Sequence, residues 1–250
     1  MSADAYDHYM SRLKTAVTRL GLQIFEMGRP GDREPIYAIA HEVGATGPRV
    51  LIAAGFHGNE QAGSWGVLRW LEGNVGPVLA RAAVTILPMV NPTGFILDQR
   101  HNLWDEDPNR GFTHTVSGKF NGSKEGAVLM QHIQSLRARA QDGFLTVHEN
   151  PHEHESYVHV MVESHESSEA GKTVREAMSK DLPMLPSGHF SEGYSVASLI
   201  PMKHTTFEDL LYHLGVKRVL CSETAGLLPL ETRTAACEAA ITAFLTHVAG

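Results

Sequence analysis

The sequence predicts an α/β layered domain built on a largely parallel sheet. Apolar stretches of strand length alternate along the chain with amphipathic stretches of helix length, which is typical of such folds. Residues 50–54, Val-Leu-Ile-Ala-Ala, are apolar at every position, as expected of a central strand covered on both faces. A chain of 250 residues can bury one full core, so we expect a single domain over residues 1–250.

The N-terminal half is expected to open with a helix and two short strands. Apolar residues recur at helical spacing from Tyr6 to Leu20, and Gly21 then provides a glycine cap. Residues 22–27 and 36–41 are predicted to be strands separated by a Gly- and Pro-rich turn, so they form a hairpin or a sheet edge. The central strand follows, and a helix with an apolar face is expected after Glu60.

The C-terminal half continues this alternation after a polar interruption. Residues 91–94, Asn-Pro-Thr-Gly, are predicted to be a turn. Residues 95–124 show no clear period and have the composition of a functional loop. The other expected elements are strands at residues 83–90, 144–147, 157–162 and 217–222 and helices at residues 126–139, 168–182, 206–215 and 232–248.

Charge and composition exclude several classes of partner. The formal net charge is −7 and no block of Lys and Arg occurs, so we expect neither nucleic acid nor a membrane surface as a partner. No stretch approaches the roughly 20 apolar residues of a membrane helix, and the acidic N-terminus does not resemble a signal peptide, so the expected compartment is cytoplasmic. Cys221 and Cys237 are too few for a disulfide framework and are expected to be reduced.

A histidine and a glutamate three residues apart follow the central strand. If a helix begins there, His57 and Glu60 lie on one face, and their nitrogen and oxygen donors suit a borderline cation such as Zn²⁺. Ligand crevices of parallel sheets lie at the carboxyl ends of strands, so the strand-end His148 is the favoured third ligand. Such a His₂Glu set leaves room for water and predicts one catalytic Zn²⁺ per chain. The competing third ligands lie directly afterwards: Glu149, His152, Glu153 and His154.

Further polar residues are candidates for catalysis and binding. Glu223 ends the last predicted strand, where partial desolvation would suit a general base, and a surface glutamate is the alternative. Asn109 and Arg110 place an amide beside a guanidinium, which suits a carboxylate ligand, although their role could instead be to pin the long loop. Arg100 is a further cation able to polarise a carbonyl group.

Taken in order, these motifs resemble those of the M14 (carboxypeptidase A-like) zinc carboxypeptidase family. The chain contains GFHGNE, NPTGF, RHN, DPNRGF, the strand-end His148 and SETAG, while the family pattern runs HxxE, NPDG, R, DxNR, H, E. The resemblance spans residues 55–226, and the joint order is more specific than any single motif. Thr93 stands where the family usually has Asp, and Pro108 lies inside the DxNR string.

The resemblance implies a three-layer α/β fold, with a mixed, mostly parallel central sheet between helices on both faces. It also implies a role for each candidate. These are zinc binding by His57, Glu60 and His148, general acid and base catalysis by Glu223, oxyanion stabilisation by Arg100, and binding of the substrate's terminal carboxylate by Asn109 and Arg110. The family's substrate-capping tyrosine has no secure match; Tyr194 and Tyr212 are candidates, and we favour Tyr194.

The expected function is therefore a zinc metallocarboxypeptidase that hydrolyses a C-terminal peptide or peptide-like amide bond in a small substrate. The aspartoacylase and succinylglutamate desuccinylase branch, which hydrolyses N-acyl amino acids, shows similar strings. That branch typically carries a further β-rich domain after the glutamate, whereas here residues 224–250 suffice only for one helix, so we favour the peptidase. A member that binds a carboxylate without hydrolysis is a third possibility. The sequence predicts neither the side-chain preference nor the oligomeric state.

Overall fold

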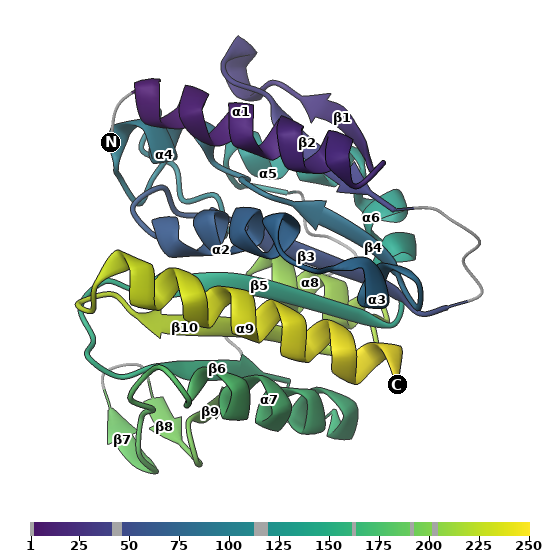
Figure 1. The fold of residues 1–250 in the computed structure, drawn as a ribbon. Helices are drawn as coiled ribbons and strands as arrows, with labels where there is room; N and C mark the ends of the chain where they lie inside the picture. The colour runs from purple at the N-terminus through teal and green to yellow at the C-terminus, as the bar shows by residue number, and fades with distance from the viewer. Residues whose placement is uncertain (1–2, 42–46, 113–119, 162–163, 191–192, 202–204) are drawn as a thin grey trace.

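A mixed sheet of eight strands forms the centre of the computed structural model, which describes residues 3–41, 47–112, 120–161, 164–190, 193–201 and 205–250 (Figure 1). In spatial order the strands of this sheet are β1 (Gln23–Gly28), β2 (Ile36–Ala40), β4 (Ala83–Leu87), β3 (Arg49–Ala54), β5 (Gly143–Asn150), β10 (Val219–Ala225), β6 (Tyr157–Val160) and β9 (Leu199–Pro201). The central strands β4, β3, β5 and β10 are parallel, and antiparallel pairs join them to β2 and β6. The predicted mixed, mostly parallel sheet is confirmed.

Helices cover both faces of this sheet, as expected (Figure 1). One face carries the long helices α1 (Ala3–Arg19), α2 (Gln61–Glu72), α7 (His165–Met178) and α9 (Leu230–Ala249). The opposite face carries α5 (Lys124–Gln131), α6 (Ile133–Arg139) and α8 (Phe207–His213). The shorter elements are η1 (Pro30–Asp32), α3 (Gly76–Leu79), α4 (Pro92–Leu97) and a hairpin of β7 (Gly188–Phe190) with β8 (Gly193–Ser195).

The central strand β3 shows why its sequence is apolar at consecutive positions. Successive side chains of a strand point to opposite faces of the sheet. Val50, Ile52 and Ala54 join the buried cluster under α1, α2, α7 and α9, whereas Leu51 and Ala53 join the cluster under α5, α6 and α8. All five side chains are fully buried. A strand covered on both faces needs this composition, so the reasoning from the sequence is confirmed.

Several predicted boundaries agree with the structure. Helix α1 ends just before Gly21, whose φ of 65° is the left-handed conformation that suits a glycine cap. Strands β1 and β2 form an antiparallel pair at the sheet edge. Thr206 caps α8, because its side chain accepts a hydrogen bond from the backbone N–H of Asp209. Local sequence signals therefore located these elements correctly.

The predicted turn at residues 91–94 is wrong, because a short helix begins there. Asn91 is the N-cap of α4, and its side chain accepts a hydrogen bond of 2.8 Å from the backbone N–H of Gly94. Pro92 occupies the first helical position. Asn followed by Pro is a helix-start signal as well as a turn signal, and here the helical alternative is adopted.

Other differences concern element lengths. The helix predicted at residues 126–139 is two helices, α5 and α6, separated at His132, whose ring is hydrogen-bonded to the carbonyl of Met27 on β1. Strands β5 and β10 continue to residues 150 and 225, because they pair side by side beyond the predicted ends. Strands β7, β8 and β9 and helix α3 were not predicted. Residues 113–119 of the predicted loop and residue 162 of a predicted strand lie outside the described residues.

The carboxyl ends of the central strands gather the candidate residues at one edge. His148 of β5 is directly opposite Glu223 of β10 in the parallel register, and Ala54, the last residue of β3, is opposite Val147. The turn after β3 therefore leads towards the end of β5.

In the described part of the chain, no helix is both long and apolar enough to cross a membrane.

Candidate active site

The turn that carries His57 and Glu60 is held close to α4. A Cβ on Gly58 would lie 1.8 Å from the carbonyl carbon of Gly94, so only glycine fits between these backbones. Glu60 is the N-cap of α2, and His57 precedes the helix. The helix begins after Glu60, as expected, so the condition that both residues lie in its first turn is not met. The turn itself brings the two side chains together.

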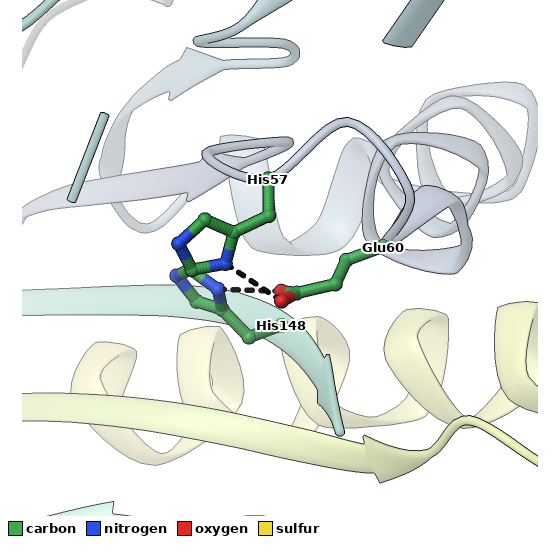
Figure 2. Close-up of side chains that lie close together, drawn as sticks. All are labelled: His57, Glu60 and His148. Atoms are coloured by element: carbon green, nitrogen blue, oxygen red, sulfur yellow. Dashed lines mark hydrogen bonds and ion pairs between the residues drawn. The ribbon is translucent and has the colours of Figure 1, made fainter. Parts of the chain in front are cut away.

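His57, Glu60 and His148 form a compact buried cluster. Nδ1 of His57 lies 2.6 Å from Oε1 of Glu60, and Nδ1 of His148 lies 2.8 Å from Oε2 of the same carboxylate. Figure 2 shows both rings directing a nitrogen towards Glu60. All three residues are at most 4% exposed. The structure thus brings together three potential metal ligands from the end of β3 and from β5.

Electrostatic coupling in this cluster is strong. Burial opposes the charge of Glu60, but the neighbouring charges on His57 and His148 outweigh burial and hold the pKa of Glu60 well below its usual range. Burial likewise disfavours a charged His148, but the carboxylates around it raise its pKa well above the usual value. The carboxylates thus favour positive charge at this position, and a bound metal cation would compete with the ring protons.

A further carboxylate lies behind His57. Oδ1 of Asp107 is 3.2 Å from Nε2 of His57, on the side of the ring away from Glu60. Arg100 links the two carboxylates, because its NH1 donates to Glu60 Oε1 and its NH2 donates to Asp107 Oδ2, both at 3.2 Å. Burial would raise the pKa of Asp107, but the hydrogen bond and charge of His57 lower it well below its usual range. Sequence reasoning gave Asp107 no role, although it belongs to the DPNRGF string.

The residues present fit a zinc ion. Two imidazole nitrogens and one carboxylate oxygen are the donor set of many catalytic zinc sites, which leave a position open for water. Metal-ligating histidines usually donate their second ring N–H to a carboxylate or carbonyl, and Asp107 provides such an acceptor for His57. The described residues also contain a neighbouring group of possible ligands formed by His148, Glu208 and Cys221.

A cavity of about 410 Å³ opens beside this cluster. Its lining includes the cluster together with Glu223, Arg100 and Arg110. Glu223 is half-buried, and the Cys221 thiol donates a long hydrogen bond of 3.7 Å to Oε1 of Glu223. The structure therefore brings an acid or base candidate and two guanidinium groups to the same cavity.

Asn109 reaches this cavity, but its side chain is engaged in the protein. The amide donates to Glu208, with 3.1 Å from Nδ2 to Oε2, and Oδ1 accepts a 2.9 Å hydrogen bond from the backbone N–H of Phe207. Arg110 is half-buried, and its NH1 donates to the carbonyl of Asn109 at 2.8 Å. These contacts agree with the alternative that Asn109 pins the loop, while Arg110 still lines the cavity.

The structure does not bring the capping-tyrosine candidates to the cavity. Tyr194 lies on β8, is 51% exposed and contacts His189 edge to face. Tyr212 lies on α8 and packs against the buried cluster on that side of the sheet. Neither ring is part of the described cavity lining. The assignment of Tyr194 stays a prediction.

The residues that competed with His148 take other positions. Glu149 is buried, accepts a hydrogen bond from the backbone N–H of Ala62, and pairs with Arg233. Its backbone N–H donates to Glu60 Oε2 at 3.2 Å, so this segment supports the cluster through its main chain. His152 and His154 are exposed, and His152 lines the outer cavity. None of the four competitors belongs to the group formed by His57, Glu60 and His148.

Sequence reasoning missed Glu208, the most buried carboxylate of the cavity lining. It is 1% exposed and lies on α8. Thr206 and Asp209 predicted the start of this helix. No feature of the neighbouring sequence indicates that the Glu208 side chain is buried in the cavity lining. An acidic residue in the first turn of a helix usually faces solvent, where it interacts favourably with the helix dipole.

Comparisons with known proteins identify the family of the chain. Residues 46–167 match the family described as "Succinylglutamate desuccinylase/Aspartoacylase catalytic domain". A search of curated proteins found no match. A solved structure from Shewanella amazonensis SB2B, described as a "putative metallopeptidase", shares 33% identity and a TM-score of 0.90, covering 97% of this chain and 92% of that one. A similarly described protein from Shewanella denitrificans OS217 shares 32% identity and a TM-score of 0.87, covering 100% of this chain and 95% of that one.

More distant structures show the same fold. A "metallo-carboxypeptidase" from Burkholderia cenocepacia has a TM-score of 0.74 at 17% identity, covering 97% of this chain and 68% of that one. The fold and these comparisons place the chain among the metal-dependent hydrolases of the metallopeptidase superfamily. The chain belongs to the M14-like metallopeptidase family, related to the succinylglutamate desuccinylases and aspartoacylases.

Proposed function

We propose that this protein is a zinc-dependent carboxypeptidase-type hydrolase that cleaves the amide bond next to a free carboxylate in a small peptide-like substrate. The observation that carries the proposal is the buried cluster of His57, Glu60 and His148 beside a cavity that also contains Glu223 and two arginines. Three metal-ligating side chains on their own would fit a structural metal site equally well. An open cavity with an adjacent carboxylate favours catalysis.

One zinc ion per chain, held by His57, Glu60 and His148, would supply Lewis acidity and a water molecule of lowered pKa. Glu223 would act as the acid and base, accepting a proton from the attacking water and returning it to the leaving amine. This assignment is supported by its half-buried position on β10, directly opposite His148 of β5.

The two arginines take different parts in the proposal. Arg100 contacts Glu60 and Asp107 through one N–H each, and a guanidinium has five N–H donors, so donors remain for the negative charge that develops on the scissile carbonyl. Arg110, anchored through the carbonyl of Asn109, would bind the terminal carboxylate. The structure supports Asn109 as the anchor of Arg110 rather than as a second carboxylate donor.

A second candidate function is hydrolysis of N-acyl amino acids. The match of residues 46–167 to the succinylglutamate desuccinylase and aspartoacylase family favours it. Such substrates also carry a carboxylate next to the scissile amide, so the same metal ligands, base and arginines would serve. The two functions differ in whether the acyl side is a peptide or a simple acyl group.

The test is a substrate panel with the zinc-loaded full chain. The panel contains blocked dipeptides with a free carboxylate, the same dipeptides with an amidated C-terminus, and N-acetyl- and N-succinyl-amino acids. Preferential cleavage of the free-acid dipeptides supports the carboxypeptidase proposal. Turnover of the simple N-acyl amino acids alone replaces it by the second candidate. Carboxylate binding without any turnover indicates a non-catalytic member.

A further inference from the structure

Glu208 is a buried carboxylate that the proposed reaction does not use. Its side chain is 1% exposed, and its Oε1 lies 3.6 Å from Nε2 of His148. Nε2 is buried and has no hydrogen-bond partner among the described residues, so Glu208 is its nearest acceptor by the ion-pair distance. An unpaired N–H at such a depth is costly, so the arrangement needs an explanation.

Two polar groups fix Glu208 in this position. The hydroxyl of Thr146, which lies two residues before His148 on β5, donates to Oε1 of Glu208 at 2.5 Å. The amide of Asn109 donates to both carboxylate oxygens, at 3.3 and 3.1 Å. Glu208 is thus held in one orientation, with Oε1 facing Nε2 of His148.

The two rings of the cluster have the same environment. Each directs Nδ1 to Glu60 and has a carboxylate near Nε2, Asp107 for His57 and Glu208 for His148. Asn109 connects these two carboxylates, because its backbone N–H donates to Asp107 Oδ1 at 2.9 Å while its side chain donates to Glu208.

From this geometry we infer that Glu208 is a positioning residue for the metal centre, accepting the Nε2–H of His148 so that the Nδ1 lone pair faces the metal. The inference deepens the proposed function and rests on it. The tautomer follows from the geometry: a neutral ring that binds a cation through Nδ1 must carry its proton on Nε2, and Glu208 is the acceptor placed there. Asn109 holds the acceptors of both rings.

The rival explanation is a second cation between His148, Glu208 and Cys221. That explanation is less favourable for two reasons. Both oxygens of Glu208 already accept hydrogen bonds from Asn109, and burial raises the pKa of the Cys221 thiol, which opposes the thiolate that a metal prefers. A second cation on Nε2, in addition to a metal on Nδ1, would also require His148 to lose both ring protons. One metal on Nδ1 leaves the Nε2 proton in place.

The experiment measures zinc affinity of the full chain by competition with a chromophoric chelator. Glu208→Ala is expected to weaken zinc binding about 10- to 100-fold, the usual effect of removing such a partner. Glu208→Gln is expected to fall between wild type and Glu208→Ala, because one amide oxygen can still accept from His148 while its NH₂ faces the Asn109 amide. Thr146→Val, which only loosens Glu208, is expected to cost about 2- to 10-fold.

Glu125→Ala is the matched control. Glu125 is also a fully buried carboxylate held by an asparagine amide, 2.6 Å from Nδ2 of Asn102, but it lies outside the cavity lining. A loss of zinc affinity of equal size in this variant would show that the effect is general destabilisation, and the inference would be wrong. Nitrogen NMR of histidine-labelled, zinc-loaded protein adds a direct readout. It is expected to show His148 protonated at Nε2 and ligated through Nδ1.

The outcomes separate this inference from the proposed function. Wild type that binds no zinc overturns both. Wild type that binds one zinc, with equal affinity in Glu208→Ala and Glu208→Gln, overturns only the positioning role. A second zinc equivalent that is lost in Glu208→Ala also overturns it, in favour of the second cation. Because Glu208→Gln and Thr146→Val keep the buried shape, the test stands even if Glu208→Ala does not fold.

Discussion

The three parallel strands β3, β5 and β10 have charged residues at both ends. The two ends differ in how far these charges are exposed to water and in what they contact. At the amino ends, Asp142 joins all three strands. Its carboxylate accepts hydrogen bonds from the backbone N–H of Arg49 at 3.0 Å and from Nζ of Lys217 at 2.6 Å, and its carbonyl accepts one from Arg218 at 3.1 Å. These charges are partly exposed to water.

At the carboxyl ends, the charged residues are buried or half-buried and surround an open cavity. His57 and Glu60 follow β3, His148 lies on β5 and Glu223 on β10. Exposed ion pairs contribute little because water screens them, whereas buried charges depend strongly on one another. The charges at the amino ends therefore add modestly to stability, whereas those at the carboxyl ends form a binding site at some cost in stability. Substitutions at the two ends should have separable effects.

The largest effect is expected for His148→Ala at the carboxyl ends. Removing one of three ligands should abolish nearly the whole zinc complement, measured by elemental analysis of the purified chain. His152→Ala is the control, because His152 lines the cavity but lies outside the cluster. If His148→Ala keeps its zinc while His152→Ala loses it, the third ligand is wrongly assigned.

A second large effect is expected for Glu223→Gln. The amide has nearly the same shape but cannot accept the proton of the attacking water, so turnover should fall at least ~100-fold. Zinc content and thermal stability should stay at wild-type values, because Glu223 is outside the three-ligand group. Steady-state kinetics with zinc analysis measure both quantities. Near-normal turnover would remove Glu223 from the mechanism.

Arg110→Ala should affect recognition rather than chemistry. Wild type is expected to prefer a free-acid substrate over its C-terminal amide by about 30- to 1000-fold in kcat/KM, the equivalent of ~2 to 4 kcal/mol for one charge-assisted contact. The variant should lose most of this preference by cleaving the free acid more slowly. Equal cleavage of both substrates by wild type would contradict the carboxypeptidase proposal.

The smallest effect is expected for Asp142→Asn at the amino ends. Burial opposes the charge of Asp142, but the hydrogen bonds from Lys217 and Arg49 lower its pKa. A lowered carboxylate pKa stabilises the fold above the unfolded-state pKa of about 3.9 and loses this contribution as the pH falls through the folded-state value. At pH 7 the variant should lose about 1 kcal/mol of unfolding free energy, with unchanged activity.

Urea denaturation at several pH values measures this effect. The difference between wild type and Asp142→Asn should shrink as the pH falls below about 4, because Asp142 becomes protonated and resembles Asn. Glu72→Gln removes an exposed ion pair with Arg12 far from the strand ends; as the control it should cost less unfolding free energy at pH 7 than Asp142→Asn. A loss of zinc or turnover in Asp142→Asn would contradict the separation of the two ends.

Much of the fold was accessible from the sequence, because its signals are local. Consecutive apolar residues at 50–54 identify a strand covered on both faces, and Gly21 and Thr206 mark helix ends through backbone geometry and capping. Errors arose where two local structures share a signal, as at Asn91 and Pro92, or where distant pairing lengthens a strand, as in β5.

The sequence by itself also identified the candidates His57, Glu60, His148 and Glu223, because strand ends in a parallel sheet share an edge. Only the tertiary structure decided which buried polar groups contact these candidates. Glu208 reaches His148 because α8 packs beneath β5 and β10, and Asn109 turns inward because Glu208 and the start of α8 take its hydrogen bonds. The physical reason is that a buried polar side chain takes its partner from whichever segment lies next to it in space, and no local pattern records that neighbour.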